Sequence, residues 1–225
     1  MIPLRDSNPS RTFPAVTILL IVLNSAVFFY ELLLGKNISV LVNHYGFVPG
    51  ENIANAHSIL TIFTSMFLHG GWMHIIGNMW FLWIFGDNVE DFLGHFRYFA
   101  FYISGGAVAS LTHFFLNHGS TVPTIGASGA IAAVMGAYFV LYPRARVLTL
   151  IPIFIIFEFI EIPAFVFLGI WFLFQFFLGS LAKMASNNAG GVAWWAHFGG
   201  FIYGVALLIF LKMRKKRRYS SEIWK

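Results

Sequence analysis

Long apolar runs separated by short polar segments make up most of the sequence. A helix that crosses a membrane needs about 20 predominantly apolar residues. Runs of roughly this length predict six spans, at residues 15–34, 74–93, 98–116, 126–142, 162–182 and 193–212. The pattern therefore predicts an all-α membrane protein, a bundle of six transmembrane helices.

Two segments do not fit a simple crossing. The apolar run 59–68 lies in a long outer loop, 35–73, and is too short to span the bilayer. We expect this loop to be structured and to lie in the interface or dip into the membrane. Residues 147–182 would form a helix of about 54 Å, far longer than the ~30 Å hydrocarbon core. Pro152 and Pro163 predict instead an inner interfacial piece followed by the fifth span.

The composition agrees with a membrane protein. The chain is 58% hydrophobic and only 10% charged, whereas a soluble domain has about 25% charged residues. So few charges exclude a soluble globular domain. The chain has no cysteine, which excludes a disulfide framework, a thiolate metal site and a cysteine nucleophile.

The basic residues divide unequally between the two sides of the predicted bundle. Six crossings return both ends to one side, and every Lys and Arg except Lys36 and Lys183 lies there. Because cytoplasmic segments are rich in Lys and Arg, we expect both termini in the cytoplasm and a multi-pass protein of a bacterial inner membrane. This topology explains the net charge of +5, so we expect no nucleic-acid partner. We divide the chain into a cytoplasmic segment (1–14), a six-span domain (15–212) and a basic cytoplasmic tail (213–225).

Four polar residues are expected at one depth. The second, fourth and sixth spans run in the same direction, from outside to inside, so their first residues share a layer in the outer half of the membrane. His74 and Asn78 lie near the start of the second span, Ser128 near that of the fourth, and His197 near that of the sixth. Polar side chains inside a membrane are costly, and a cluster of them is by default a site hypothesis.

A serine and a histidine form the minimal nucleophilic pair. The imidazole takes the hydroxyl proton and later protonates the leaving amine. No Asp or Glu lies near His197 in the sequence, so the pattern predicts a Ser128–His197 dyad without a carboxylate. The Ser128 backbone N–H, with His74 and Asn78 four residues apart on one helix face, are candidate donors to an oxyanion.

Each of these features also has a structural interpretation. A serine near Gly129, Ala132 and Gly136 is typical of a helix face that packs closely against another helix. The Gly200-x-x-x-Gly204 ladder after His197 favours the same close packing, which would bring His197 to Ser128.

The remaining polar residues are assigned structural roles. His74 and Asn78 also suit a polar clamp, or a metal site with His69, but a third well-spaced ligand is missing, so we expect no metal and no cofactor. Three acidic residues near the inner end of the second span are expected to orient loops or to pair with Arg97. They are Asp87, Glu90 and Asp91.

Four separated motifs occur in order between about residues 60 and 212. They are His69-Gly-Gly-Trp-Met-His74-Ile-Ile-Gly-Asn78, Glu90-x-x-x-Gly94 with Arg97, Gly126-Ala-Ser128-Gly, and Ala196-His197-x-x-Gly200-x-x-x-Gly204. Each motif alone is weak. In this order on a six-span protein, they resemble the rhomboid family of intramembrane serine proteases.

The resemblance implies a role for each candidate residue. Ser128 matches the nucleophile, His197 the base, and Asn78 and His74 the oxyanion-stabilising side chains. It also implies a rhomboid-like bundle whose first outer loop, 35–73, is partly embedded, with the second and fifth spans beside the lateral entry of substrate.

The sequence departs from the family pattern in two places. Some members carry an aromatic residue four positions after the serine, which packs on the catalytic imidazole, but here that position is Ala132. We therefore expect Trp194 or Trp195 to orient His197. The first loop also lacks a Trp-Arg pair that some members have.

These observations predict an intramembrane serine endopeptidase that cleaves transmembrane-segment peptide bonds of membrane proteins. Its expected partners are transmembrane protein substrates and membrane lipids, and nothing in the sequence indicates an oligomeric state. The main alternative is a non-catalytic rhomboid-like protein that binds transmembrane helices for quality control or trafficking. A small transporter is a third interpretation, but the sequence has no inverted repeat.

Overall fold

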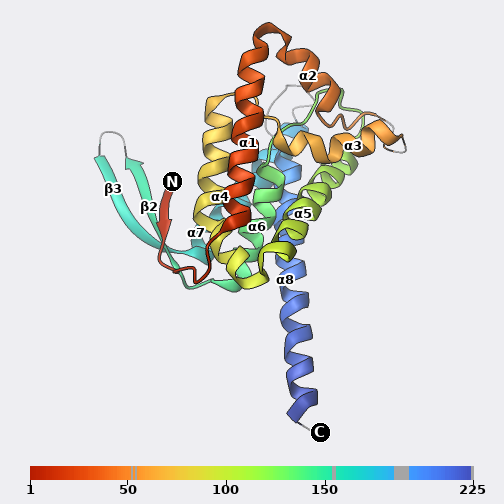
Figure 1. The fold of residues 1–225 in the computed structure, drawn as a ribbon. Coiled ribbons are helices and arrows are strands. Elements are labelled where there is room, and N and C mark those ends of the chain that lie inside the picture. Colours follow the sequence, from red (N-terminus) through yellow and green to blue (C-terminus); the bar gives the residue numbers. More distant parts are fainter. Residues whose placement is uncertain (52, 54, 154–155, 185–192, 224–225) are drawn as a thin grey trace.

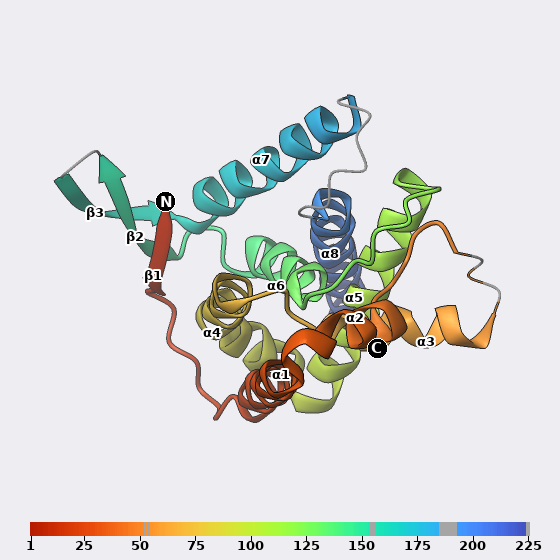
Figure 2. The ribbon, with the colours of Figure 1, turned by 90° about the horizontal axis from the view of Figure 1, so that it is seen from above.

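The computed structural model describes residues 1–51, 53, 55–153, 156–184 and 193–223. Its main body is a helical bundle, with α6 in the middle of the surrounding helices (Figures 1 and 2). The six helices that fall on the predicted spans are α1 (Ala15–Leu34), α4 (Trp72–Leu93), α5 (His95–Leu116), α6 (Ser128–Leu141), α7 (Ala164–Met184) and α8 (Trp194–Ile223). The predicted class, a helical membrane protein, is confirmed. Below, the outer end of the bundle is the end at which α4, α6 and α8 begin.

The helices differ in how well they can cross a membrane alone. In the described residues, four segments are long and apolar enough; they begin at Ala15, His95, Ala164 and Trp194. A fifth candidate joins Ala56–Phe67 to Trp72–Leu93 across an 82° bend. Helix α6 is a shorter apolar helix of 14 residues, about 21 Å long. It is therefore shorter than the ~30 Å hydrocarbon core, and its first residue, Ser128, is half-buried.

Glycines let α8 approach α6 closely. A Cβ at Gly200 would lie 2.1 Å from the backbone oxygen of Gly129, and a Cβ at Gly204 would lie 2.0 Å from that of Ala133. Both distances are far below van der Waals contact, so the two backbones touch directly. This confirms the predicted packing of the small-residue faces, which draws the start of α8 toward the start of α6.

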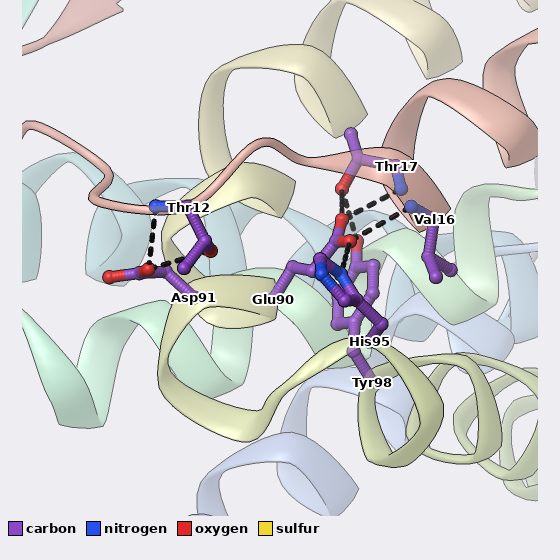
Figure 3. Close-up of polar contacts among 7 residues, drawn as sticks. All are labelled: Thr12, Val16, Thr17, Glu90, Asp91, His95 and Tyr98. Carbon is purple, nitrogen blue, oxygen red and sulfur yellow. Dashed lines mark hydrogen bonds and ion pairs between the residues drawn. The ribbon is translucent and has the colours of Figure 1, made fainter.

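Helix α1 is capped by a carboxylate from α4 (Figure 3). Its own N-cap residue, Pro14, makes no side-chain capping hydrogen bond. The Glu90 carboxylate accepts hydrogen bonds from the backbone N–H groups of Val16 and Thr17, from the Thr17 hydroxyl, and from His95 Nδ1 at 2.6 Å. Asp91 holds the preceding segment through Thr12. The acidic residues thus orient a loop, as expected, and none of them pairs with Arg97 in the described structure.

The first outer loop is structured, as predicted. It contains η1 (Gly35–Asn37), α2 (Ile38–Tyr45), α3 (Ala56–Thr64) and η2 (Ser65–Phe67). The 82° bend between the α3–η2 segment and α4 turns this segment across the bundle. Buried Phe47 forms an isolated bridge with Thr124, which ties the loop to the segment before α6.

A three-stranded antiparallel sheet is the main feature that the sequence analysis missed. Its order is β1 (Ile2–Asp6), β2 (Arg146–Ile153) and β3 (Ile156–Pro163). The break before the fifth span is confirmed, since α7 begins directly after Pro163, but the inner piece is a hairpin rich in β-branched and aromatic residues. The Trp80 indole on α4 donates a 2.6 Å hydrogen bond to the Pro3 carbonyl. The N-terminal segment is therefore part of the fold.

Candidate active site

Ser128 and His197 are in hydrogen-bonding contact. Ser128 begins α6 and His197 lies in the first turn of α8, and their Oγ and Nε2 atoms are 2.7 Å apart. The imidazole is buried, whereas the hydroxyl is half-buried. The shared depth of the fourth and sixth spans and the close glycine packing together produce this contact.

Gln175 on α7 orients the imidazole. Its Oε1 lies 2.7 Å from His197 Nδ1, and an amide oxygen only accepts hydrogen bonds. Nδ1 therefore carries the proton, and Nε2 presents a lone pair to the Ser128 hydroxyl. The sequence analysis missed Gln175, although a signal was present: it is the only amide or charged side chain between residues 164 and 182.

Two indoles flank the same imidazole. The ring centroid of Trp171 lies 6.0 Å from that of His197, and the centroid of Trp194 lies 6.3 Å away with the rings at 90°. Trp195, the other predicted candidate, packs on Phe198 instead. Ala132 is buried and carries no ring, and the imidazole is held by Gln175, Trp171 and Trp194.

His74 and Asn78 face the backbone just before Ser128. A Cβ at Gly126 would lie 2.6 Å from His74 Nε2 and 3.6 Å from Asn78 Nδ2, and Gly126 has a φ of +121°. The Gly70 N–H donates to His74 Nδ1 at 3.3 Å, so His74 Nε2 carries the proton. Asn78 Nδ2 is buried, and no group in the described structure accepts its hydrogens. Two N–H donors thus lie beside the Gly126 backbone, and the buried Asn78 amide has no hydrogen-bond partner in the described structure.

These residues line a cavity of about 770 Å³. Helix α4 provides one wall with His74, Asn78 and Phe81, and α7 provides another with Trp171 and Gln175. Its volume is within the range of ligand-binding pockets. All four residues predicted from the sequence, Ser128, His197, His74 and Asn78, line this cavity.

The described residues contain no group of three potential metal ligands. His69 is buried and packs edge-on against His74, with ring centroids 5.1 Å apart. Its backbone N–H donates to Glu31 Oε1 at 3.0 Å. In this structure His69 therefore supports His74. The absence of a metal and a cofactor stays a prediction.

A comparison with family models identifies the fold. The model described as the Rhomboid domain matches residues 56–214, most of the chain. The chain belongs to the rhomboid family. With its several apolar helices, this rhomboid is an integral, multi-pass membrane protein.

Curated relatives carry rhomboid names. The chain is 30% identical over 182 residues to Rhomboid protein 1, mitochondrial, of Saccharomyces cerevisiae, covering 74% of this chain and 47% of that protein. It is 28% identical over 166 residues to Presenilin-associated rhomboid-like protein A, mitochondrial, of Danio rerio, covering 69% and 38%. It is 30% identical over 167 residues to Rhomboid-like protease 5 of Toxoplasma gondii, covering 71% and 17%. This rhomboid thus spans less than half the length of each of these relatives.

Proposed function

We propose that this rhomboid is an intramembrane serine endopeptidase that uses Ser128 as nucleophile and His197 as base. The observation that carries the proposal is the chain of two 2.7 Å contacts from Ser128 Oγ through the imidazole to Gln175 Oε1. It supplies a base in the correct tautomer at the hydroxyl, which a merely structural serine does not need.

The geometry supports acyl transfer in two steps. His197 Nε2 takes the Ser128 proton as Oγ attacks the scissile carbonyl, and the proton then passes to the leaving amine. The oxyanion of the tetrahedral intermediate receives hydrogen bonds from His74 Nε2, from the otherwise unpartnered Asn78 Nδ2 and from the Ser128 backbone N–H. Water then hydrolyses the acyl-enzyme by the same route, with His197 again as base.

The substrates we propose are transmembrane segments of other membrane proteins. The cavity lies between α4 and α7, so a segment that enters there approaches from the membrane. Because a helix hides its carbonyls in hydrogen bonds, the segment must unwind first, and residues with low helix propensity near the scissile bond favour this. We further propose a bacterial inner membrane with both termini cytoplasmic, because the basic residues gather on that side.

The test uses the full chain reconstituted in liposomes. Ser128→Ala and His197→Ala are each expected to abolish cleavage of a model transmembrane substrate while the protein stays folded in the membrane. A fluorophosphonate probe is expected to label the wild type but not Ser128→Ala. Wild-type cleavage by either variant would refute the dyad. If the wild type binds the substrate but neither cleaves it nor is labelled by the fluorophosphonate, the non-catalytic alternative would be indicated.

A further inference from the structure

A second cavity, of about 1180 Å³, lies at the inner end of the bundle. It is separate from the candidate active site, because Tyr142 on its wall directly follows α6 whereas Ser128 begins that helix, about 21 Å away along the axis. Its walls come from the segment before α1, from the junction of α4 and α5, and from α8.

Three arginines line this cavity, one from each of these walls. They are Arg11 before α1, Arg97 on α5 and Arg214 on α8. Within the described residues, none of the three guanidinium groups has a hydrogen bond or an ion pair. Arg97 belongs to the motif with Glu90 that the candidate active site does not use.

The charges in the cavity do not balance. Asp91 is the one carboxylate on its wall, and the Thr12 backbone N–H and hydroxyl already donate to it, at 3.0 and 2.7 Å. Three positive charges against one leave an excess of two. A guanidinium binds phosphate oxygens through two parallel N–H groups, so such an excess is suited to a phosphate ester.

The apolar part of the wall indicates where the phosphate comes from. Leu93 and Leu211 line the cavity beside the arginines, and both are on the helices that enter the membrane. Apolar side chains next to guanidinium groups match the junction of a phospholipid headgroup and its acyl chains. Inorganic phosphate would make no contact with this apolar wall, so the wall favours a phosphate that carries acyl chains.

We propose that the inner cavity is a binding site for the headgroup phosphate of an anionic phospholipid. The bound phosphate joins the segment before α1 to α5 and α8. This proposal does not depend on the catalytic one, since no residue that lines the inner cavity also lines the cavity of the candidate active site.

The binding test uses the full chain, purified in an uncharged detergent, and follows its melting temperature. A short-chain phosphatidylglycerol is titrated against the matching phosphatidylcholine and against inorganic phosphate. A ligand that binds the folded state raises the melting temperature in proportion to the logarithm of its concentration over Kd. We expect phosphatidylglycerol alone to stabilise the wild type.

Variants locate the site. Arg97→Gln and Arg214→Gln are each expected to weaken phosphatidylglycerol binding about fivefold, since one basic side chain near a membrane surface contributes about that factor. Arg144→Gln is the matched control, because Arg144 is at the same end of the bundle but outside the cavity. Arg97→Lys keeps the positive charge but cannot form the bidentate hydrogen bonds of a guanidinium to the phosphate, so it tests that contact separately from the charge. If Arg97→Gln does not fold, Arg214→Gln and the lipid phosphorus retained after purification provide the same test.

Three results would overturn the proposal. One is equal stabilisation by phosphatidylglycerol and phosphatidylcholine. Another is an equal loss of binding in Arg144→Gln and in the two cavity variants. The third is stabilisation by inorganic phosphate as strong as that by the lipid, which would assign the cavity to a soluble phosphate compound.

Discussion

The role of Gln175 can be tested by replacing its amide with an apolar group of similar shape. Gln175→Met removes the acceptor of the 2.7 Å contact with His197 Nδ1 and keeps most of the packing. In the transition state the imidazole becomes an imidazolium, so this hydrogen bond becomes charge-assisted and contributes about 1.5–3 kcal/mol. Its loss corresponds to a fall in kcat of about 10- to 150-fold.

The assay measures kcat and KM for a model transmembrane substrate, together with the rate at which a fluorophosphonate labels Ser128. We expect kcat and the labelling rate to fall together while KM changes little, because Gln175 acts through His197. Gln175→Glu retains an acceptor oxygen and is expected to restore most of the labelling. Ser180→Ala is the matched control, since the Ser180 hydroxyl donates to the Phe176 carbonyl on the same helix. Wild-type labelling of Ser128 in folded Gln175→Met would refute the orienting role.

Three further predictions follow from particular contacts. Gly126→Ala places a Cβ 2.6 Å from His74 Nε2 at a backbone φ of +121°. We expect kcat to fall at least about 100-fold, which is the effect of losing one oxyanion donor. Gly169→Ala is the control, because Gly169 has open space around it, and it is expected to keep the wild-type kcat. Gly204→Ala places a Cβ 2.0 Å from a backbone oxygen of α6 and is expected to lower the free energy of unfolding by about 3 kcal/mol or more, seen as a lower melting temperature than that of Gly169→Ala. Burial raises the pKa of the Asp6 carboxyl to about 6, so its contribution to stability is full below about pH 4 and is lost as the pH rises through 6. The protection of the β1 amides, corrected for the base-catalysed rise of the intrinsic exchange rate, is expected to fall over this range in the wild type and to stay constant in Asp6→Asn.

The sequence was sufficient to predict a helical membrane protein with helices near the six expected positions, and to select four polar residues that line one cavity. The spans are predicted directly from hydropathy. Because alternate spans run in the same direction, residues far apart in the sequence, such as Ser128 and His197, are expected at the same depth. Their lateral contact depends on glycines that were visible as a ladder, Gly200 and Gly204. The site was therefore predictable wherever depth and close packing decide the geometry.

Gln175 was not predicted because helix α7 is apolar all round, so no amphipathic pattern indicates which face it turns to the bundle. The direction in which each span runs would nevertheless have indicated Gln175. The fifth span runs from inside to outside, so its second half shares the outer layer with Ser128. A single amide in that half is as costly as the histidines, and the same rule that selected His197 applies to it.

The sheet escaped prediction for a different reason, and it bears on how the cavity opens. Its pairing joins residues 2–6 to residues 146–153, a separation that no local pattern can reveal. Strand β1 is bound to α4 through Trp80, and β3 leads directly into α7, so the sheet connects the two helices that wall the candidate active site. On α7 the connection is at the inner end, whereas on α4 it is at Trp80, next to the cavity-lining residue Phe81. The sheet therefore holds α4 at the level of the cavity and α7 only at its inner end, so a separation that admits a substrate segment is expected to come from the outer half of α7, which carries Gln175.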